Sequence, residues 1–141
     1  MKITTNWDEE NGITIYRVSY DNKYYVGISE CHPDDKEFQS QDFGEALASV
    51  RATLDFLRDL RDNEIIPQLK IIKHLYTNMT TSKQYNPKSY EATMIRRKYL
   101  QLQDQYTTVR NQIRQFKDQE AFILDTKESF NSLIRSKSNN K

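Results

Sequence analysis

The longest segment without glycine or proline sets the main constraint on this fold. It covers the 54 residues from Lys88 to Lys141 of a 141-residue chain. Apolar residues recur in it at alternating steps of three and four, which is the spacing of one face of a long α-helix. The pattern therefore predicts a long amphipathic helix over 87–135 and a frayed polar tail over 136–141. We call its apolar face the seam; its members are Ile95, Tyr99, Leu102, Tyr106, Val109, Ile113, Phe116, Ile123, Phe130 and Ile134.

The seam is long compared with the rest of the chain. A helix of this length spans about 70 Å, whereas the two helices predicted before it reach only about 30 Å and 20 Å. Soluble monomers rarely expose a large apolar stripe, so a second copy of the chain is the simplest cover for the remainder. We therefore expect a homo-oligomer, a dimer or higher. The alternative is a bend near Glu120, which interrupts the seam, because the helix could then fold back on itself.

The positions that flank the seam contain no acidic residue. Parallel pairing of two identical seams would therefore bring cations together. The seam could instead pair antiparallel, meet acidic residues of the first helix, or hold an anion between helices. The flanking residues are Arg96, Gln103, Arg110 and Lys117 on one side, and Lys98, Gln105, Gln112 and Gln119 on the other.

The first third of the chain has the character of a β-sheet and contains all three glycines. Ile13–Tyr20 is β-branched and aromatic, as strands prefer. Asp21-Asn22 tolerates the positive φ of a tight hairpin turn, and Tyr24–Cys31 returns as a second strand with Tyr24, Val26 and Ile28 on one face. Lys2–Trp7 completes a three-stranded antiparallel sheet, with a turn through Asp8–Gly12.

Helices are predicted from Gly44 onward, after a loop over Cys31–Phe43. Asp42 is the expected cap of the first helix, and Asp62–Glu64 is expected to break or bend it. Pro67 suits the first turn of a second, short helix. The apolar faces of these two helices are Leu47, Val50, Leu54, Leu57 and Leu60 in the first, and Leu69, Ile72 and Leu75 in the second.

Asn78–Ser89 is polar and predicts a loop, and Asn86-Pro87 is a start signal for the long helix. The sequence thus predicts an α+β fold in a single domain over 1–141. Its parts are a sheet and loop over 1–43, helices over 44–77 and the long helix over 87–135.

The charge is unevenly distributed along the chain. Residues 1–45 hold ten acids and four bases, a charge of −6, and because the whole chain carries +1, the remainder carries +7. The two parts could attract each other, or the helical part could bind an anionic ligand. The low net charge makes bulk electrostatic capture of nucleic acid unfavourable. No segment has the apolar length of a signal peptide or a membrane span, so we expect a cytoplasmic protein with no membrane partner.

One short segment has residues of the kind used in catalysis and metal binding. Cys31 and His32 could form a nucleophile and its base, and Asp34, Asp35 and Glu37 could bind a divalent cation. Adjacent loop residues rarely point at each other, so a turn whose carboxylates cap backbone amides is the favoured interpretation. Cys31 is the only cysteine, which excludes an intrachain disulfide and a four-ligand zinc site of the usual kind. We expect neither an enzyme nor a cofactor.

Phosphate recognition would have to come from arginine, because three glycines cannot build a phosphate-binding loop. Arg96, Arg97, Arg110 and Arg114 lie on the long helix among Tyr99 and Tyr106. Arginine for phosphate and tyrosine for a base or ribose would make a nucleotide pocket. The alternative is a solvated cationic face beside the seam.

Two blocks of sequence resemble a known group of proteins. Ser29-Glu30-Cys31-His32-Pro33-Asp34-Asp35-Lys36-Glu37-Phe38 is followed by Phe43-Gly44-Glu45-Ala46-Leu47-Ala48-Ser49-Val50-Arg51-Ala52. This arrangement resembles a block in small phage and prophage proteins. With a sheet first and long helices after it, the chain is similar to the phage anti-Thoeris sponge family of the first-described type.

The resemblance implies a counter-defence protein that acts without catalysis. Members of that family sequester cyclic ADP-ribose isomers in pockets between protomers. For this sequence the ligand-binding candidates, chosen by chemistry, are Arg96, Arg97, Arg110, Tyr85, Asn86 and Tyr99. Arg51 and Asp34 belong to the matching block and are expected to form a structural pair. The alternatives are a coiled-coil protein that inhibits a host defence enzyme or nuclease by direct binding, and a nucleic-acid binder.

Overall fold

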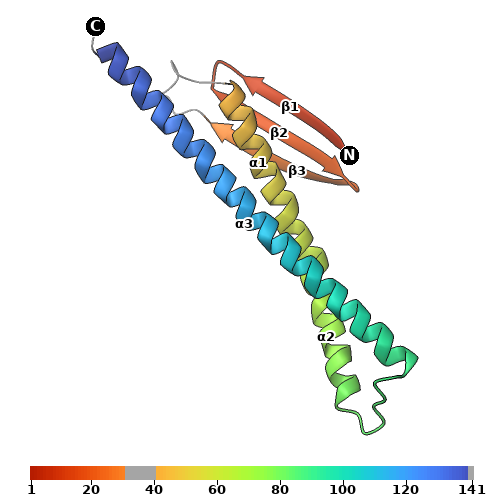
Figure 1. The fold of residues 1–141 in the computed structure, drawn as a ribbon. Helices are drawn as coiled ribbons and strands as arrows, with labels where there is room; N and C mark the ends of the chain where they lie inside the picture. Colours follow the sequence, from red (N-terminus) through yellow and green to blue (C-terminus); the bar gives the residue numbers. More distant parts are fainter. Residues whose placement is uncertain (31–40, 140–141) are drawn as a thin grey trace. The chain divides into compact units, whose positions relative to one another are not determined.

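The computed structural model describes residues 1–30 and 41–139 and has an α+β fold (Figure 1). Three strands come first: β1 (Lys2–Asp8), β2 (Ile13–Tyr20) and β3 (Lys23–Glu30). They are followed by α1 (Gln41–Asp59), the π-helical segment η2 (Leu60–Ile65), α2 (Ile66–Thr80) and α3 (Tyr90–Asn139). The predicted fold class, an N-terminal antiparallel sheet before helices with a long C-terminal helix, is confirmed.

The chain divides into two compact units. One consists of Met1–Phe56 with Arg114–Lys141, and the other of Leu57–Ile113. Because α1 and α3 each pass from one unit to the other, the units are not successive segments of the chain. We call them the sheet unit and the hairpin unit and describe each by itself.

The sheet has the order β1-β2-β3 and is antiparallel throughout. Asp21 and Asn22 have φ values of 51° and 62°, so the β2–β3 turn uses the left-handed conformation that these residues were predicted to supply. In the β1–β2 turn, the Asp8 carboxylate accepts a hydrogen bond from the backbone N–H of Asn11 at 3.2 Å. The predicted strands are confirmed to within one residue at the ends that the structure describes.

The face of β3 that packs on α1 carries two small residues, Gly27 and Ser29, beside Tyr25. A β-carbon on Gly27 would overlap the carbonyl oxygen of Ala48 and would lie 2.5 Å from the amide nitrogen of Ala52. Helix and strand backbones therefore come into direct contact here. The opposite face, with Tyr24, Val26 and Ile28, is 69%, 36% and 47% exposed. The more apolar face of the strand thus points away from the helix, because only the glycine face allows so close an approach.

Further contacts hold the sheet against α1. A β-carbon on Gly44 would overlap the hydroxyl of Thr14, which is fully buried and has no hydrogen-bond partner among the described residues. Tyr20 and Tyr25 both meet Phe56 edge-on, at centroid distances of 5.9 and 5.1 Å. The buried side chains that α1 contributes to this unit are Leu47, Ala48, Val50, Ala52 and Leu54.

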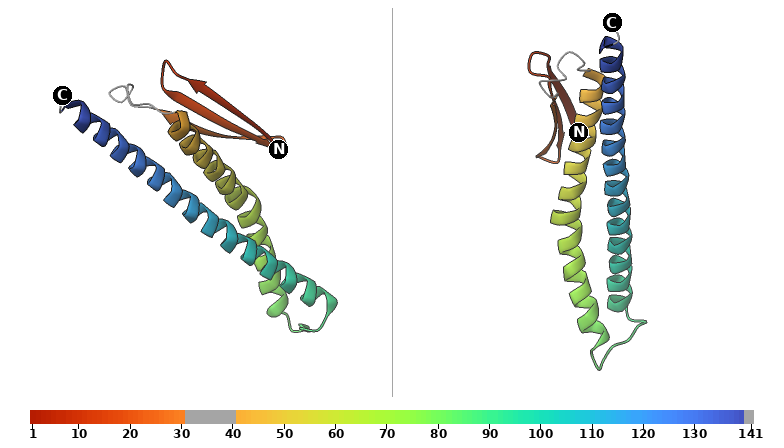
Figure 2. Two further views of the ribbon diagram at one scale, coloured as in Figure 1. Left: turned by 45° about the horizontal axis from the view of Figure 1, so that its top comes forward. Right: turned by 90° about the vertical axis from the view of Figure 1, so that its left-hand side faces the viewer.

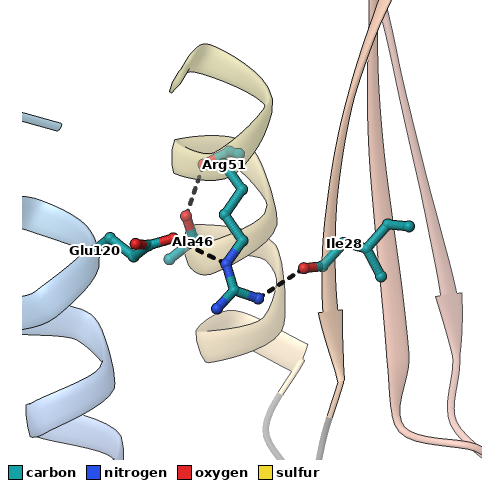
Figure 3. Close-up of polar contacts among 5 residues, drawn as sticks. Ile28, Ala46, Arg51 and Glu120 are labelled. Carbon is teal, nitrogen blue, oxygen red and sulfur yellow. Dashed lines mark hydrogen bonds and ion pairs between the residues drawn. The ribbon is translucent and has the colours of Figure 1, made fainter. Parts of the chain in front are cut away.

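Arg51 connects three elements of the sheet unit (Figure 3). Its Nε donates to the Glu120 carboxylate of α3 at 2.9 Å, and its Nη1 donates to the Ile28 carbonyl of β3 at 2.8 Å. In this unit α1 lies between the sheet and the C-terminal part of α3 (Figure 2). Arg51 thus links three structural elements, and its predicted pair with Asp34 stays a prediction because Asp34 lies outside the described residues. Glu120 interrupts the seam because it meets Arg51, and the alternative of a bend there is wrong, since α3 continues through it.

The first helix was predicted to break or bend at Asp62–Glu64, and the structure shows no break. α1, η2 and α2 follow one another without a loop from Gln41 to Thr80. Pro67 lacks an N–H and its ring crowds the carbonyl four residues earlier, a conflict that the wider π-helical turn before it can relieve. The prediction of a break failed because the polar run over Asp62–Glu64 was taken as a stop signal, whereas the backbone absorbs it in a π-helical turn. Pro67 does lie in the first turn of α2, as predicted.

Several helix boundaries differ from the prediction. α1 begins at Gln41, so Asp42 lies in its first turn and does not precede the helix as a cap. The N–H of Ala92 bonds to the Ser89 hydroxyl at 3.2 Å, which makes Ser89 the cap of α3 in place of Asn86. Asn86 forms the preceding turn, where its side chain accepts a hydrogen bond from the N–H of Lys88 at 3.0 Å. α3 also extends past residue 135, to Asn139.

The seam faces inward along the described part of α3. Leu102, Val109 and Ile113 are buried, and the other described members are half-buried, so none of them is exposed. The argument that the seam needs a second copy to cover it is therefore wrong for these residues. The error came from counting two short helices where the chain has one uninterrupted helical run. The homo-oligomer itself stays a prediction, and the side chains of Phe130 and Ile134 lie outside the described set.

None of the helices described here has an apolar stretch long enough to cross a membrane.

Candidate functional site

The hairpin unit contains an open groove with a volume of about 570 Å³. One wall comes from α2 and the other from α3, which the loop of residues 81–89 joins. Ligand pockets commonly have volumes of about 300–1,000 Å³, so the groove has room for a small molecule. Its lining residues are Ile66, Leu69, Lys70 and Lys73 of α2, and Tyr99, Gln103, Tyr106 and Thr107 of α3.

Two tyrosines form the aromatic part of the α3 wall. Tyr99 and Tyr106 stand seven residues apart and are half-buried. The Tyr99 ring stacks on Tyr76 of α2 with a centroid distance of 5.5 Å and an angle of 12° between the ring planes. This stack fixes the orientation of Tyr99. Tyr106 has no such partner ring among the described residues and presents its side chain to the groove.

The charge of the groove is positive. Lys70 and Lys73 are three residues apart, so they project from the same side of α2, and both are exposed. No carboxylate is among the residues that line the groove. Gln103 and Thr107 add an amide and a hydroxyl to the opposite wall. An anion with an apolar or aromatic portion therefore matches this lining.

A second groove in the same unit has the opposite polarity. Its volume is about 390 Å³, and it contains Glu64 of η2 and Asp104 of α3 but no basic residue. The comparison shows that the positive lining of the larger groove is a local feature and does not reflect a general excess of lysine. Its other lining residues are Leu60, Ile65, Gln68, Gln105, Thr108 and Val109.

Only one of the six predicted ligand-binding residues lines the larger groove, namely Tyr99. Arg96 donates to the carbonyl of Pro87 at 3.0 Å, so it ties α3 to the preceding loop. Asn86 also belongs to that loop and makes a turn, and Tyr85 is half-buried beside it. Arg97 and Arg110 are exposed on α3 and line neither groove. None of the three predicted arginines lines this groove, and their role in a pocket between protomers stays a prediction.

The lysines of α2 were missed although a signal was present in the sequence. Lys70 and Lys73 flank Leu69 and Ile72, at the border of the apolar face of α2. Such border positions face a neighbouring helix obliquely, where a long side chain can reach over a groove. The sequence does not say which residues of α3 lie opposite these lysines. In the structure they are Tyr99 and Tyr106.

The residues that line the groove do not form a known catalytic constellation. They include no histidine, cysteine or carboxylate. Across the described residues, no cluster of three or more histidine, cysteine or acidic side chains could hold a metal ion. The segment from Cys31 to Glu37, predicted to be a turn, lies outside the described residues.

Comparisons with protein-family models, with curated proteins and with solved structures gave no match for this chain. The resemblance to the anti-Thoeris sponge family accordingly stays a prediction.

Proposed function

We propose that this protein binds a small cyclic nucleotide of the cyclic ADP-ribose type in the α2–α3 groove and sequesters it without turning it over. The observation that carries the proposal is the combination of Lys70, Lys73, Tyr99 and Tyr106 on the walls of one groove. Lysine ammonium groups can pair with a pyrophosphate. A tyrosine ring can stack on the adenine or contact a ribose.

The residues that the groove lacks also support binding over hydrolysis. Cleavage of a glycosidic or phosphoanhydride bond needs a positioned base, a nucleophile or a metal. The lining includes no histidine, cysteine or carboxylate for these roles and supplies one amide, hydroxyls and ammonium groups. With the family resemblance, this makes a phage-encoded counter-defence role the most specific form of the proposal. A second protomer over the open side of the groove would complete the expected shared pocket.

Isothermal titration calorimetry with a panel of cyclic ADP-ribose isomers tests the proposal directly. We expect one or more isomers to bind with micromolar or tighter affinity, while linear ADP-ribose binds more weakly. Chromatography of the ligand after incubation should recover it unchanged. No binding across the panel would remove the proposal, and conversion of the ligand would replace sequestration by catalysis.

Substitution of the groove lysine locates the site. Lys73→Ala should weaken binding by about 2 kcal/mol, roughly thirtyfold, because it removes a charge-assisted contact. Lys98→Ala is the matched control, since Lys98 is an exposed lysine of the same unit that does not line the groove. Equal affinities of the two variants would place the ligand elsewhere.

The runner-up function is inhibition of a host enzyme by direct contact through the helices. Large apolar side chains exposed on α3 favour it, among them Phe122 (71% exposed) and Leu100 (57% exposed). This function predicts a protein that copurifies with the chain from host cells and no small ligand. Phe122→Ser would then abolish copurification, whereas Lys73→Ala would not.

A further inference from the structure

We propose that β1 is a self-pairing edge: two copies of the chain join their β1 strands antiparallel about a two-fold axis at Thr5, which makes one continuous sheet from two. The proposal concerns the sheet unit and does not depend on the nucleotide proposal, whose groove lies within residues 57–113.

The two edges of the sheet differ. On β3, the Asp55 carboxylate accepts a hydrogen bond from the backbone N–H of Val26 at 3.4 Å, and Arg51 donates to the Ile28 carbonyl at 2.8 Å. Side chains of α1 thus bond to one outward-pointing N–H and one outward-pointing C=O of that strand. On the other edge, β1 pairs with β2 alone among the described elements, and all of its residues except Trp7 are exposed. An open edge of this length is a template for another strand.

The β3 contacts also fix which groups of β1 point outward. In antiparallel sheets a residue directs its N–H and C=O to the same neighbour, and successive residues alternate. The backbone N–H of Val26 and the backbone C=O of Ile28 point away from β2. In the observed register, Gly27 therefore pairs with Tyr16 of β2 through backbone hydrogen bonds. Ile15 and Arg17 then bond to Asn6 and Thr4 of β1. The outward groups of β1 are therefore those of Ile3, Thr5 and Trp7.

The sequence of β1 is complementary to itself in this arrangement. With the two-fold axis at Thr5, Thr5 faces its own copy and Ile3 faces Trp7, and every outward N–H and C=O group gains a partner. On the other face, Lys2 lies opposite Asp8, so opposite charges meet. Ile3, which is 48% exposed, would be covered by the partner's Trp7. A shift of the register by two residues would lose the charge pairing and leave outward groups without partners.

Pairing of a seven-residue strand alone makes a small interface. Stable interfaces bury about 1,600 Å² in total, and contacts well below that size are weak. We therefore expect the β1 contact to form at tens of micromolar or above, unless a second interface supports it. This estimate sets the concentration for the tests.

Cysteine cross-linking tests the register. Facing residues of a hydrogen-bonded antiparallel pair have Cα atoms about 5.5 Å apart, within the range that a disulfide spans. In the full chain with Cys31→Ser, Thr5→Cys should form a covalent dimer at least tenfold faster than Lys2→Cys. The two Lys2 residues would be six positions apart along the strands, about 20 Å. Comparable rates, or no cross-link at Thr5→Cys, would overturn the proposal.

A proline at the axis tests the ladder itself. Thr5→Pro removes an N–H that points away from β2, so the sheet within the chain keeps its hydrogen bonds while self-pairing loses two of its own. Thr5→Val keeps the N–H and is the control. In sedimentation velocity, Thr5→Pro should raise the dissociation constant of this association at least tenfold over Thr5→Val. Identical constants in a folded Thr5→Pro variant would contradict the model, and if that variant does not fold, the cross-linking comparison decides.

Discussion

The two units of this protein are held together in contrasting ways. In the sheet unit, Gly27 lets the backbones of β3 and α1 come into direct contact, and Gly44 of α1 makes room for the side chain of Thr14. In the hairpin unit, large side chains such as Tyr76 and Tyr99 fill the space between α2 and α3, and an open groove remains beside them. Close contact leaves little space between helix and strand at Gly27, whereas packing through long side chains leaves the concave surface of the groove. The difference accounts for the location of the candidate site.

The largest expected effect comes from breaking the close contact of the sheet unit. Gly27→Val should lower the free energy of unfolding by more than about 3 kcal/mol, because the new side chain meets the backbone of α1. Urea denaturation gives the magnitude, and amide hydrogen exchange should show faster opening in residues 1–56 than in 57–113. Ile28→Val, at an exposed neighbouring position, is the control and should change stability by less than about 0.5 kcal/mol. If Gly27→Val lowers the free energy of unfolding as little as the control does, the close contact between Gly27 and α1 is contradicted.

The equivalent test of the hairpin unit removes a buried side chain. Leu102 is 2% exposed, so Leu102→Ala should cost about 3 kcal/mol through lost burial and the cavity left behind. Leu100→Ala on the same helix removes the same atoms from an exposed position and should cost far less. Calorimetry on both variants measures the difference. Equal melting temperatures would mean that the seam does not face inward.

A smaller effect is expected from the link within the sheet unit between α1 and α3. A double-mutant cycle with Arg51→Met and Glu120→Gln should give a coupling energy of about 1 kcal/mol, since the pair is about one-third exposed. The coupling should decrease in high salt. A coupling near zero would show that the 2.9 Å contact adds nothing to stability.

The smallest effect concerns titration in η2. The hydrogen bond from Arg61 lowers the pKa of the Asp62 carboxyl below its ordinary value. The stability that this lowered pKa contributes is fully present when the pH is above the ordinary pKa of aspartate. It is lost as the pH falls through the pKa of Asp62 in the folded protein. Because Asp62 is exposed, the effect on unfolding should be slight, but an NMR titration of its carboxyl carbon should detect it. Arg61→Gln should move the pKa of Asp62 upward; an unchanged titration would refute the contact.

The sequence predicted the strands and the long helix because local chemistry decides them. Asp21-Asn22 determines the β2–β3 turn because both residues tolerate a positive φ. The seam repeats often enough to show which face of α3 is apolar. The sequence did not predict which face of β3 is covered. That choice depends on the contact between Gly27 and Ala48, which are distant in sequence and have no signature in hydrophobic periodicity.

The candidate site was less predictable than the fold. Tyr99 and the arginines were all selected by chemical type, and of these only Tyr99 lines the groove. Which side chains at the border of an apolar face reach a groove depends on how the two helices are rotated about their axes. Here Lys70 and Lys73 of α2 reach it. Arg96 is instead held by the carbonyl of Pro87, a contact that no spacing rule indicates.

The π-helical segment has a consequence for the ancestry of this chain. Its hydrogen-bond loops hold one residue more than those of an α-helix, so it marks a point where a single residue can be gained or lost without creating a loop. A homologue that lacks this residue would align with a gap between Leu57 and Ile65, inside a helix. Homologues are therefore expected to differ in length at this position as well as in the loops. An alignment that allows no gap inside this helix would miss such homologues.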